Sequence, residues 1–438
     1  VDADIDAPEA WDIAVALPDV TVAVLDSGTD YDHEDLECNI WVNPGEDIGG
    51  DGIVMDPADN NGVDDDGNGY IDDLIGWDLA APDNDPDPSN FHGTHVAGII
   101  GACGDNATGV IGVAGGTGGA TGAKMWVLLD GNAAPIGAVM DDAIIYAADN
   151  GADIIALSLS VGQTAAIDAA LQDAYDTMGV LIVNASGNDN GAVGYPASSI
   201  YAMAVGSTDD DDIRAGNSNF GPELEVAAPG VSIMSTTLAD TYGLASGTSM
   251  ASPHVSGTAA LMMSFNPLAS NQDVRDCLTA TAEDEVGDPA QDTPGRDDFY
   301  GWGRINAADA LICIAANSPP VCDANGPYTA ECSMDTMLDG SGSTDPDGDA
   351  MTYDWEGPFE SSPTSGVMPT VVFPAPTGLK SVDLTVTDTI GDSDSCSASV
   401  TVQDTLDPSI TAPDGVLNEC TSPDGTPADL GDPVTSDV

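Results

Sequence analysis

Residues 20–25, Val-Thr-Val-Ala-Val-Leu, form a nearly continuous apolar run. A strand that is buried on both faces of a parallel sheet has this pattern. Similar runs occur at residues 153–157, 180–183 and 201–205. Between them, residues 139–149 and 164–175 have apolar side chains at helical spacing. Alternating strands and helices of this kind predict that residues 1–316 form a three-layer α/β domain around a parallel sheet.

Residues 317–320, Asn-Ser-Pro-Pro, break this alternation and are typical of a linker. Beyond them, apolar and polar residues alternate strictly at 381–386 and again at 397–402, with turn residues at 390–392. This predicts a hairpin of an antiparallel, all-β sandwich over residues 317–403. Residues 404–438 are too few to fold alone and are interpreted as the start of a further β module.

The chain carries 75 Asp and Glu but only 6 Lys and Arg, a formal net charge of −69. Such a field repels nucleic acid and anionic membranes, so neither is expected as a partner. It also strains the compact state unless cations bind or screen it, which favours a salt-rich or calcium-rich medium and a halophilic or marine source. An acidic surface that serves only solubility explains the charge equally well.

Eight cysteines without a CxxC pair favour structural disulfides in an oxidising compartment over a zinc site. No stretch approaches the roughly 18 apolar residues of a membrane span. The first residues, Val-Asp-Ala-Asp, contain no basic or apolar leader, so a signal peptide is expected to have been removed or not included. A secreted, extracellular protein is therefore expected.

Two candidate catalytic side chains follow the first strand run. Asp26 stands at the carboxyl end of that run, where open α/β sheets form their sites, although an Asp there is more often a turn or cap residue. His92 begins the sequence His-Gly-Thr-His-Val-Ala-Gly and can take and return a proton near neutrality. Two alternatives are a metal site with His95, for which no Cys or suitably spaced Glu is nearby, and a core residue.

Ser249 lies in Gly-Thr-Ser-Met-Ala-Ser-Pro-His at residues 247–254, before a helical segment at 255–263. A Ser at this position can be a simple N-cap. However, a helix N-terminus also offers unpaired N–H groups and a positive dipole end that stabilise a developing oxyanion. Gly247 allows the tight turn that would present the hydroxyl to solvent.

Together these motifs, in the order Asp, His, Ser, resemble the subtilisin-like serine peptidases over residues 5–313. The resemblance implies an endopeptidase acting on proteins through an acyl-enzyme, with Ser249 as nucleophile, His92 as base and then acid, and Asp26 orienting the imidazole. Asn188, in Ala-Ser-Gly-Asn-Asp, matches the family's oxyanion-hole Asn; its alternative is a turn residue. The second His of each motif, His95 and His254, is structural in the family.

Further positions match the family's substrate site. An extended substrate would pair with the strand end at Ser158, Leu159 and Ser160, where the family usually has Gly in place of Ser160. Ala185, Ser186, Gly187 and Gly194 match the primary specificity pocket. Gly194 at its floor predicts room for a large apolar or aromatic side chain, and no acid is present to select Lys or Arg.

The resemblance also implies Ca²⁺. Asp35 falls at the family's strong calcium site, whose partner loop would be residues 103–110 with Asp105 and Val110 contributing. Cys38 follows Asp35 closely and Cys103 begins that loop. An ion shared by the two segments would bring these cysteines together, so we expect a Cys38–Cys103 bridge.

Between Asp35 and His92, residues 64–73 read Asp-Asp-Asp-Gly-Asn-Gly-Tyr-Ile-Asp-Asp. Oxygen ligands at alternate positions with Gly at the bend predict an EF-hand-like calcium site, although the Glu at position twelve is missing; a merely acidic loop is the alternative. The ligands expected are Asp64, Asp66, Asn68, Tyr70 and Asp73. Asp59, Asp83, Asp85 and Asp87 are either weaker sites or solvated.

The motifs at residues 325–328, 339–349 and 353–355 resemble a PKD-type domain, which implies an immunoglobulin-like sandwich with Trp355 in its core. Such domains often hold insoluble protein or matrix for secreted hydrolases; a spacer is the alternative. Asp345, Asp347 and Asp349 are a further candidate calcium site, and residues 404–438 weakly resemble a truncated hyalin repeat. Cys277 is expected to pair with Cys313 and Cys332 with Cys396, whereas the partners of Cys322 and Cys420 stay open.

A second function stays open beside the endopeptidase. The chain would then be an extracellular structural or adhesive protein whose peptidase domain acts only in self-processing.

Overall fold

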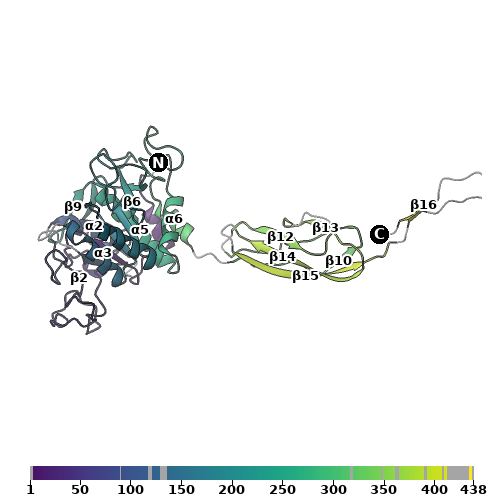
Figure 1. Ribbon diagram of the computed structural model, residues 1–438, viewed down its shortest axis with the longest axis horizontal. Coiled ribbons are helices and arrows are strands. Elements are labelled where there is room, and N and C mark those ends of the chain that lie inside the picture. The colour runs from purple at the N-terminus through teal and green to yellow at the C-terminus, as the bar shows by residue number, and fades with distance from the viewer. Residues whose placement is uncertain are drawn as a thin grey trace, which may run out of the picture. The chain divides into compact units, whose positions relative to one another are not determined.

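The computed structural model describes residues 3–88, 90–116, 121–128, 136–315, 319–346, 349–360, 365–388, 392–406, 409–411 and 434–436. The chain forms two compact units, Val1–Ala316 and Asn317–Val438 (Figure 1).

The first unit contains a seven-stranded parallel sheet in the order β2-β3-β1-β4-β5-β6-β7. Its strands are β1 (Thr21–Leu25), β2 (Gly76–Trp77), β3 (Lys124–Leu128), β4 (Ile154–Leu157), β5 (Leu181–Ala185), β6 (Met203–Thr208) and β7 (Leu224–Pro229). The apolar runs of the sequence thus become adjacent parallel strands, and the predicted α/β class is confirmed.

Helices cover both faces of this sheet, and an antiparallel hairpin of β8 (Ile233–Thr237) and β9 (Thr241–Ala245) packs against α2. The helices are α1 (Ala7–Ile13), α2 (Phe91–Gly101), α3 (Met140–Asp149), α4 (Ala165–Gln172), α5 (Thr248–Phe265), α6 (Asn271–Ala280) and α7 (Ala307–Ile314). Single turns are Glu37–Asn39, Ile136–Ala138 and the π-helical Asp173–Thr177.

Two large hydrophobic cores lie on opposite faces of the sheet in the described part of the first unit, and alternate residues of β1 contribute to one or the other. Val22 and Val24 belong to the core shared with α2 and α5, whereas Ala23 and Leu25 belong to the one shared with α3 and α4. Small residues bring α5 close to the segments it covers: a Cβ on Gly257 would lie 2.7 Å from the Cβ of Val113. This close packing of α2 and α5 on one face positions the two motifs that begin those helices.

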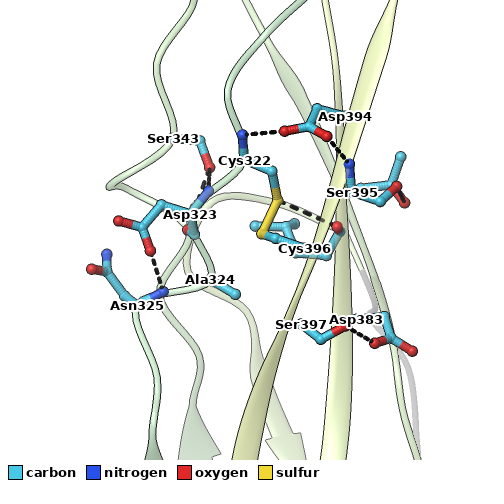
Figure 2. The surroundings of a disulfide bond; sticks show 12 residues. Cys322, Asp323, Ala324, Asn325, Ser343, Asp383, Asp394, Ser395, Cys396 and Ser397 are labelled. Atoms are coloured by element: carbon cyan, nitrogen blue, oxygen red, sulfur yellow. Dashed lines mark hydrogen bonds between the residues drawn. A yellow bond between two sulfur atoms is a disulfide. The ribbon is translucent and has the colours of Figure 1, made fainter.

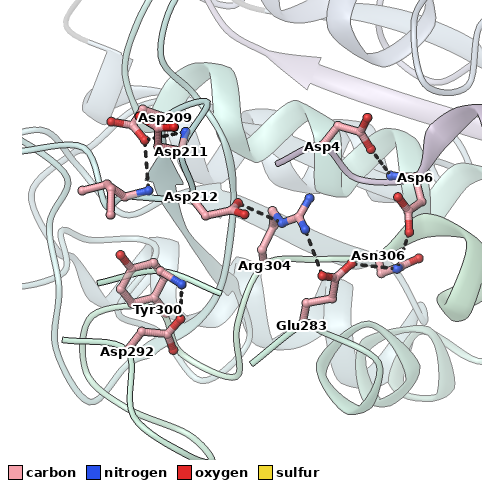
Figure 3. Close-up of polar contacts among 12 residues, drawn as sticks. Asp4, Asp6, Asp209, Asp211, Asp212, Glu283, Asp292, Tyr300, Arg304 and Asn306 are labelled. Atoms are coloured by element: carbon pink, nitrogen blue, oxygen red, sulfur yellow. Dashed lines mark hydrogen bonds and ion pairs between the residues drawn. The ribbon is translucent and has the colours of Figure 1, made fainter. Parts of the chain in front are cut away.

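A buried arginine ties the end of this unit to its beginning (Figure 3). Arg304, which has no exposed surface, pairs through Nε with Asp212 at 3.0 Å and through a terminal nitrogen with Glu283 at 2.9 Å. Asn306 donates to both Glu283 (2.9 Å) and Asp6 (2.6 Å). Removing this guanidinium would leave the buried carboxylate of Asp212 without a counter-charge, which typically costs about 3–5 kcal/mol.

The second unit is a β-sandwich of a four-stranded sheet, in the order β10-β15-β14-β12, and the pair β11-β13. Its strands are β10 (Tyr328–Glu331), β11 (Asp335–Met337), β12 (Thr352–Glu356), β13 (Thr370–Val372), β14 (Gly378–Thr387) and β15 (Ser393–Gln403). The predicted hairpin is confirmed as antiparallel β14 and β15, and Trp355 is 1% exposed in the core. Beyond it, β16 (Ser409–Thr411) pairs with β17 (Val434–Ser436).

Two of the expected disulfides are confirmed. Cys38 is bonded to Cys103, with their Cα atoms 6.2 Å apart, and Cys277 to Cys313, with a Cα separation of 5.7 Å. The first bridge fixes the segment after Asp35 to the loop that follows α2.

The expected Cys332–Cys396 bridge is wrong, because Cys396 is bonded to Cys322 instead (Figure 2). The N–H of Cys332 donates to the carbonyl of Gln403, seven residues along β15 from Cys396 and therefore about 23 Å away. Disulfide-bonded Cα atoms lie within about 7 Å. Cys322 is held near the start of β15 by a 3.0 Å hydrogen bond to Asp394. Cys332 is buried and has no disulfide partner among the described residues, which do not include Cys420.

Candidate active site

Asp26 and His92 form the central contact of the site. Asp26 directly follows β1 and is 4% exposed, and its Oδ1 lies 2.7 Å from Nδ1 of His92. The same Oδ1 accepts the N–H of Ser27 at 2.8 Å. His92 is the second residue of α2 and keeps 30% of its side chain exposed. The imidazole is therefore anchored through Nδ1 and open on its other side.

The first turn of α2 must approach the Asp26 loop very closely for this contact. A Cβ on Gly93 would lie 2.1 Å from the carbonyl oxygen of Gly28, so only glycine fits there. Asn90 caps the helix by accepting the N–H of His92 at 2.9 Å, and the Gly93 N–H donates to Oγ of Ser27 at 3.1 Å. These bonds hold the histidine backbone in place.

The environments of the three motif histidines differ. Burial lowers the pKa of His92, but the negative charge of Asp26 and its hydrogen bond outweigh this effect, and the net pKa lies above the ordinary value. Burial lowers the pKa of His95, whose Nε2 lies 3.1 Å from the carbonyl of Gly243. Desolvation lowers the pKa of His254 to about 4. Only His92 combines exposure with an anionic partner, and His95 is directed to a carbonyl rather than to a site shared with His92.

Ser249 is the second residue of α5 and is 9% exposed. Its hydroxyl donates to the carbonyl of Ser158 at 3.1 Å, and the hydroxyl of Ser158 donates to the carbonyl of Ser249 at 3.0 Å. In this structure the Ser249 hydroxyl is thus bonded to the strand end at 158 rather than to His92. Catalytic hydrogen bonds commonly form only when substrate is bound.

Asn188 follows β5 and is exposed. Its Oδ1 accepts the N–H of Thr248 at 2.9 Å and the Thr248 hydroxyl at 3.2 Å. With the oxygen held in this way, the amide nitrogen is the atom left to donate. Gly247 is required beneath it, since its φ is +151° and a Cβ would lie 3.2 Å from the Asn188 amide. Asn188 is thereby fixed against the first turn of α5.

Two of the residues expected to bind substrate, Ser160 and Ser186, lie beside Gly194. Its N–H donates to the carbonyl of Ser186 at 2.8 Å, and a Cβ on it would lie 2.9 Å from Oγ of Ser160. Gly187, with φ +107°, donates its N–H to Thr248 at 3.2 Å. The Ser160 hydroxyl therefore stands over Gly194 and takes space that was expected to be open to a large side chain.

Asp35 lies against the loop at residues 103–110 that was expected to share an ion with it. Asp35 is fully buried and accepts the side-chain N–H of Asn106 at 2.6 Å and the main-chain N–H of Val110 at 2.9 Å. Asn106 was not anticipated, although it lies in the expected partner loop. Asp105 is an exposed residue of the same loop.

The acidic insertion differs from the expected ligand set. Oxygens of Asp64 and Asp66 lie within 4.8 Å of each other and of Glu46, a buried residue that sequence reasoning missed. Asp73 is not part of this group, because it accepts the hydroxyl of Tyr146 and the amide of Asn68 (3.0 Å), and burial raises its pKa to about 6. No local signal marks Glu46, which lies 18 residues before Asp64 in the chain.

The other expected ligands have different surroundings. The Tyr70 ring packs edge-on against Tyr146, at 4.6 Å between centroids. In the second unit, the N–H of Asp349 donates to Asp345 at 3.1 Å, and Asp347 lies outside the described residues.

Known proteins resemble the chain over most of the first unit. It is 35% identical over 305 residues to the thermophilic serine proteinase of Bacillus sp. strain AK1, covering 69% of this chain and 64% of that protein. It is 35% identical to the halolysin-like extracellular serine protease Nep of Natrialba magadii, covering 69% and 49%, and 34% identical to thermitase of Thermoactinomyces vulgaris, covering 70% and 93%. The chain thus spans less than two thirds of the first two relatives.

Within the described part of the chain, no helix is long and apolar enough to cross a membrane. Residues 317–403 match the PKD domain model. Residues 18–303, which carry the Asp26–His92 pair and the α5 motif, match the model of the subtilase family, and the chain belongs to that family.

Proposed function

We propose that this chain is a secreted serine endopeptidase that hydrolyses peptide bonds of proteins. The observation that carries the proposal is the 2.7 Å contact between Asp26 and an imidazole whose other face is open. The relatives named as serine proteinases support the activity, and the one named as extracellular supports secretion.

In the proposed reaction Ser249 Oγ attacks the substrate carbonyl while Nε2 of His92 takes the hydroxyl proton. Asp26 holds the proton on Nδ1 and stabilises the imidazolium. His92 then gives its proton to the leaving amine, which departs and leaves the acyl-enzyme. In the second half of the reaction water attacks the acyl carbonyl while His92 takes a proton from it. His92 then returns that proton to Ser249 Oγ as the acid product leaves. The amide nitrogen of Asn188 and the N-terminus of α5 would stabilise the oxyanion.

The substrate would lie extended along Ser158–Ser160, with the side chain before the scissile bond directed toward Ala185–Gly187 and Gly194. Because the Ser160 hydroxyl stands over Gly194, we expect this pocket to favour smaller side chains than an open glycine floor would.

Calcium is proposed at two places in the first unit, Asp35 with residues 103–110 and the Glu46–Asp64–Asp66 group. The second fits a hard cation because Glu46 is fully buried and its Oε2 has no hydrogen-bond partner among the described residues. Ca²⁺ would neutralise these carboxylates and cross-link the segments. Asp345 and Asp349 would form a further site in the second unit.

The proposed division is a catalytic domain at 1–316, a PKD domain at 317–403 and a further β module from 404 to 438. The PKD domain would attach the enzyme to insoluble protein or matrix. The alternative, an adhesive protein whose peptidase domain acts only in self-processing, predicts no turnover of other proteins.

Turnover of casein in saline calcium buffer tests the proposal. The wild-type chain and Ser256→Ala, which removes another hydroxyl from α5, should hydrolyse it, whereas Ser249→Ala should not. If the wild-type chain does not hydrolyse casein, the self-processing alternative is favoured.

A further inference from the structure

We propose a second, separate site for a calcium-like divalent cation in the acidic insertion, formed by Asp47, Asp51 and Asp59. One carboxylate oxygen of each residue lies within 4.8 Å of those of the other two. Ca²⁺ binds oxygen ligands at about 2.3–2.6 Å, so a single ion can bridge oxygens at this separation.

Asp59 supplies the observation that distinguishes this group from solvated surface acids. The residue is 3% exposed, and its Oδ1 accepts the N–H of Gly49 at 3.2 Å. Its other oxygen, Oδ2, is buried without a hydrogen-bond partner anywhere in the described chain. A buried carboxylate oxygen in this state is unfavourable unless a cation or a proton satisfies it.

Asp47 is held in a fixed orientation toward this group. Its Oδ1 accepts the N–H groups of Gly50 (2.7 Å) and Asp51 (3.2 Å), and its Oδ2 accepts that of Gly52 at 2.9 Å. The main chain of residues 50–52 thus surrounds the carboxylate of Asp47, and the carboxylate of Asp51 lies near it. The ligands are therefore positioned before an ion arrives.

No Lys or Arg side chain neutralises the group in the described part of the chain. Residues 43–73 contain ten Asp and Glu and no Lys or Arg. The six basic residues of the chain have contacts in other segments: Lys124 with Cys38, Arg214 with Asn190, Arg275 with Glu225, Arg296 with Asp298, Arg304 with Asp212 and Lys380 with Pro374. A bound metal ion, or a proton held between the carboxylates, is the remaining source of positive charge, and the ion count below distinguishes the two.

Apolar burial holds only part of the insertion, through Val54 and Met55, which are half-buried against the core of the first unit, and through Tyr70, which packs on Tyr146. Ile48, Ile53, Val63 and Ile71 are between 48% and 61% exposed. A loop that buries so little apolar surface needs another source of order. The consecutive residues Glu46 and Asp47 belong to different carboxylate groups, so an ion at each would tie this dipeptide to residues 51 and 59 and to residues 64 and 66.

The number of bound ions tests this proposal independently of catalysis. The full chain carrying Ser249→Ala, which prevents autolysis, is dialysed against micromolar Ca²⁺, and the calcium per chain is measured by atomic emission. Adding Asp59→Asn should lower the count by one. Adding Asp65→Asn, which removes an exposed acid of the same loop outside both groups, should leave it unchanged.

Asp51→Asn provides a second variant, because Asp51 is exposed and its substitution leaves the buried packing intact. It should raise the Ca²⁺ concentration needed to fill one site at least tenfold. An unchanged ion count and affinity in both Asp59→Asn and Asp51→Asn, with the chain folded by circular dichroism, would overturn the proposal. So would a higher melting temperature of Asp59→Asn with no lost ion, since Asp59 would then be only a buried acid.

Discussion

Ser158 and Ser249 exchange hydrogen bonds: each hydroxyl donates to the main-chain carbonyl of the other, at 3.0 and 3.1 Å. The reason lies one turn further along α5, where Pro253 has no N–H to donate to the carbonyl of Ser249. The helix thus leaves this carbonyl free, and the hydroxyl at the end of β4 takes it. Proline inside the helix couples the strand end to the serine motif.

Replacing Ser158 by Ala should leave the buried carbonyl of Ser249 without a donor and lower the free energy of unfolding by about 1–3 kcal/mol. In a Pro253→Ala background the restored main-chain N–H of that position can donate to the carbonyl instead, so the same Ser158→Ala change should cost less. Urea denaturation of the four chains of this double-mutant cycle measures the difference. An equal loss in both backgrounds would contradict the coupling.

The pH dependence of kcat/KM should report the raised pKa of His92. The base must be neutral, so activity should fall as the pH decreases through a value above the ordinary histidine pKa of about 6.5. Asp26→Asn removes the charge that raises the pKa, so the acid limb should move to lower pH, and the plateau should fall by about 10⁴-fold. An acid limb that stays in place would show that another group controls it.

Ser160→Gly should widen the pocket over Gly194. We expect the ratio of kcat/KM for peptides with Phe rather than Ala before the scissile bond to rise about tenfold, since a mismatch of one small group in such a pocket is worth about 1–3 kcal/mol. Ser160→Ala should give an intermediate ratio. Identical ratios in all three chains would mean that Ser160 does not face the substrate.

The disulfide arrangement of the second unit can be read by mass spectrometry. A non-reduced digest should contain a linked peptide with Cys322 and Cys396, and Cys332 should react with maleimide only after denaturation. A Cys332–Cys396 peptide would restore the pairing expected from the sequence and contradict the strand register.

Patterns that lie close together in the sequence were sufficient to predict much of the fold. The runs at β1, β4, β5 and β6 are buried on both faces, which makes them continuous and easy to recognise. The α5 motif was recognisable because residues 247–254 resemble the serine motif of the subtilisin-like family.

Features that depend on long-range register could not be predicted. The pairing of Cys396 follows from how β10 aligns with β15, which neither strand specifies alone. Glu46 meets Asp64 only because the insertion folds back on itself. Ser160 was noted as a departure from glycine. Its contact with Gly194 joins two segments that are 34 residues apart in the chain, and no local pattern indicates that they meet.

The central claim is that Asp26 and His92 activate the hydroxyl of Ser249. Its most direct test is the reaction of the folded chain with a fluorophosphonate, followed by peptide mapping of the adduct. A single adduct on Ser249, formed rapidly by the wild-type chain and at least a thousandfold more slowly by His92→Ala, is the predicted result. Rapid labelling at another residue, or equal rates in the two chains, would contradict it.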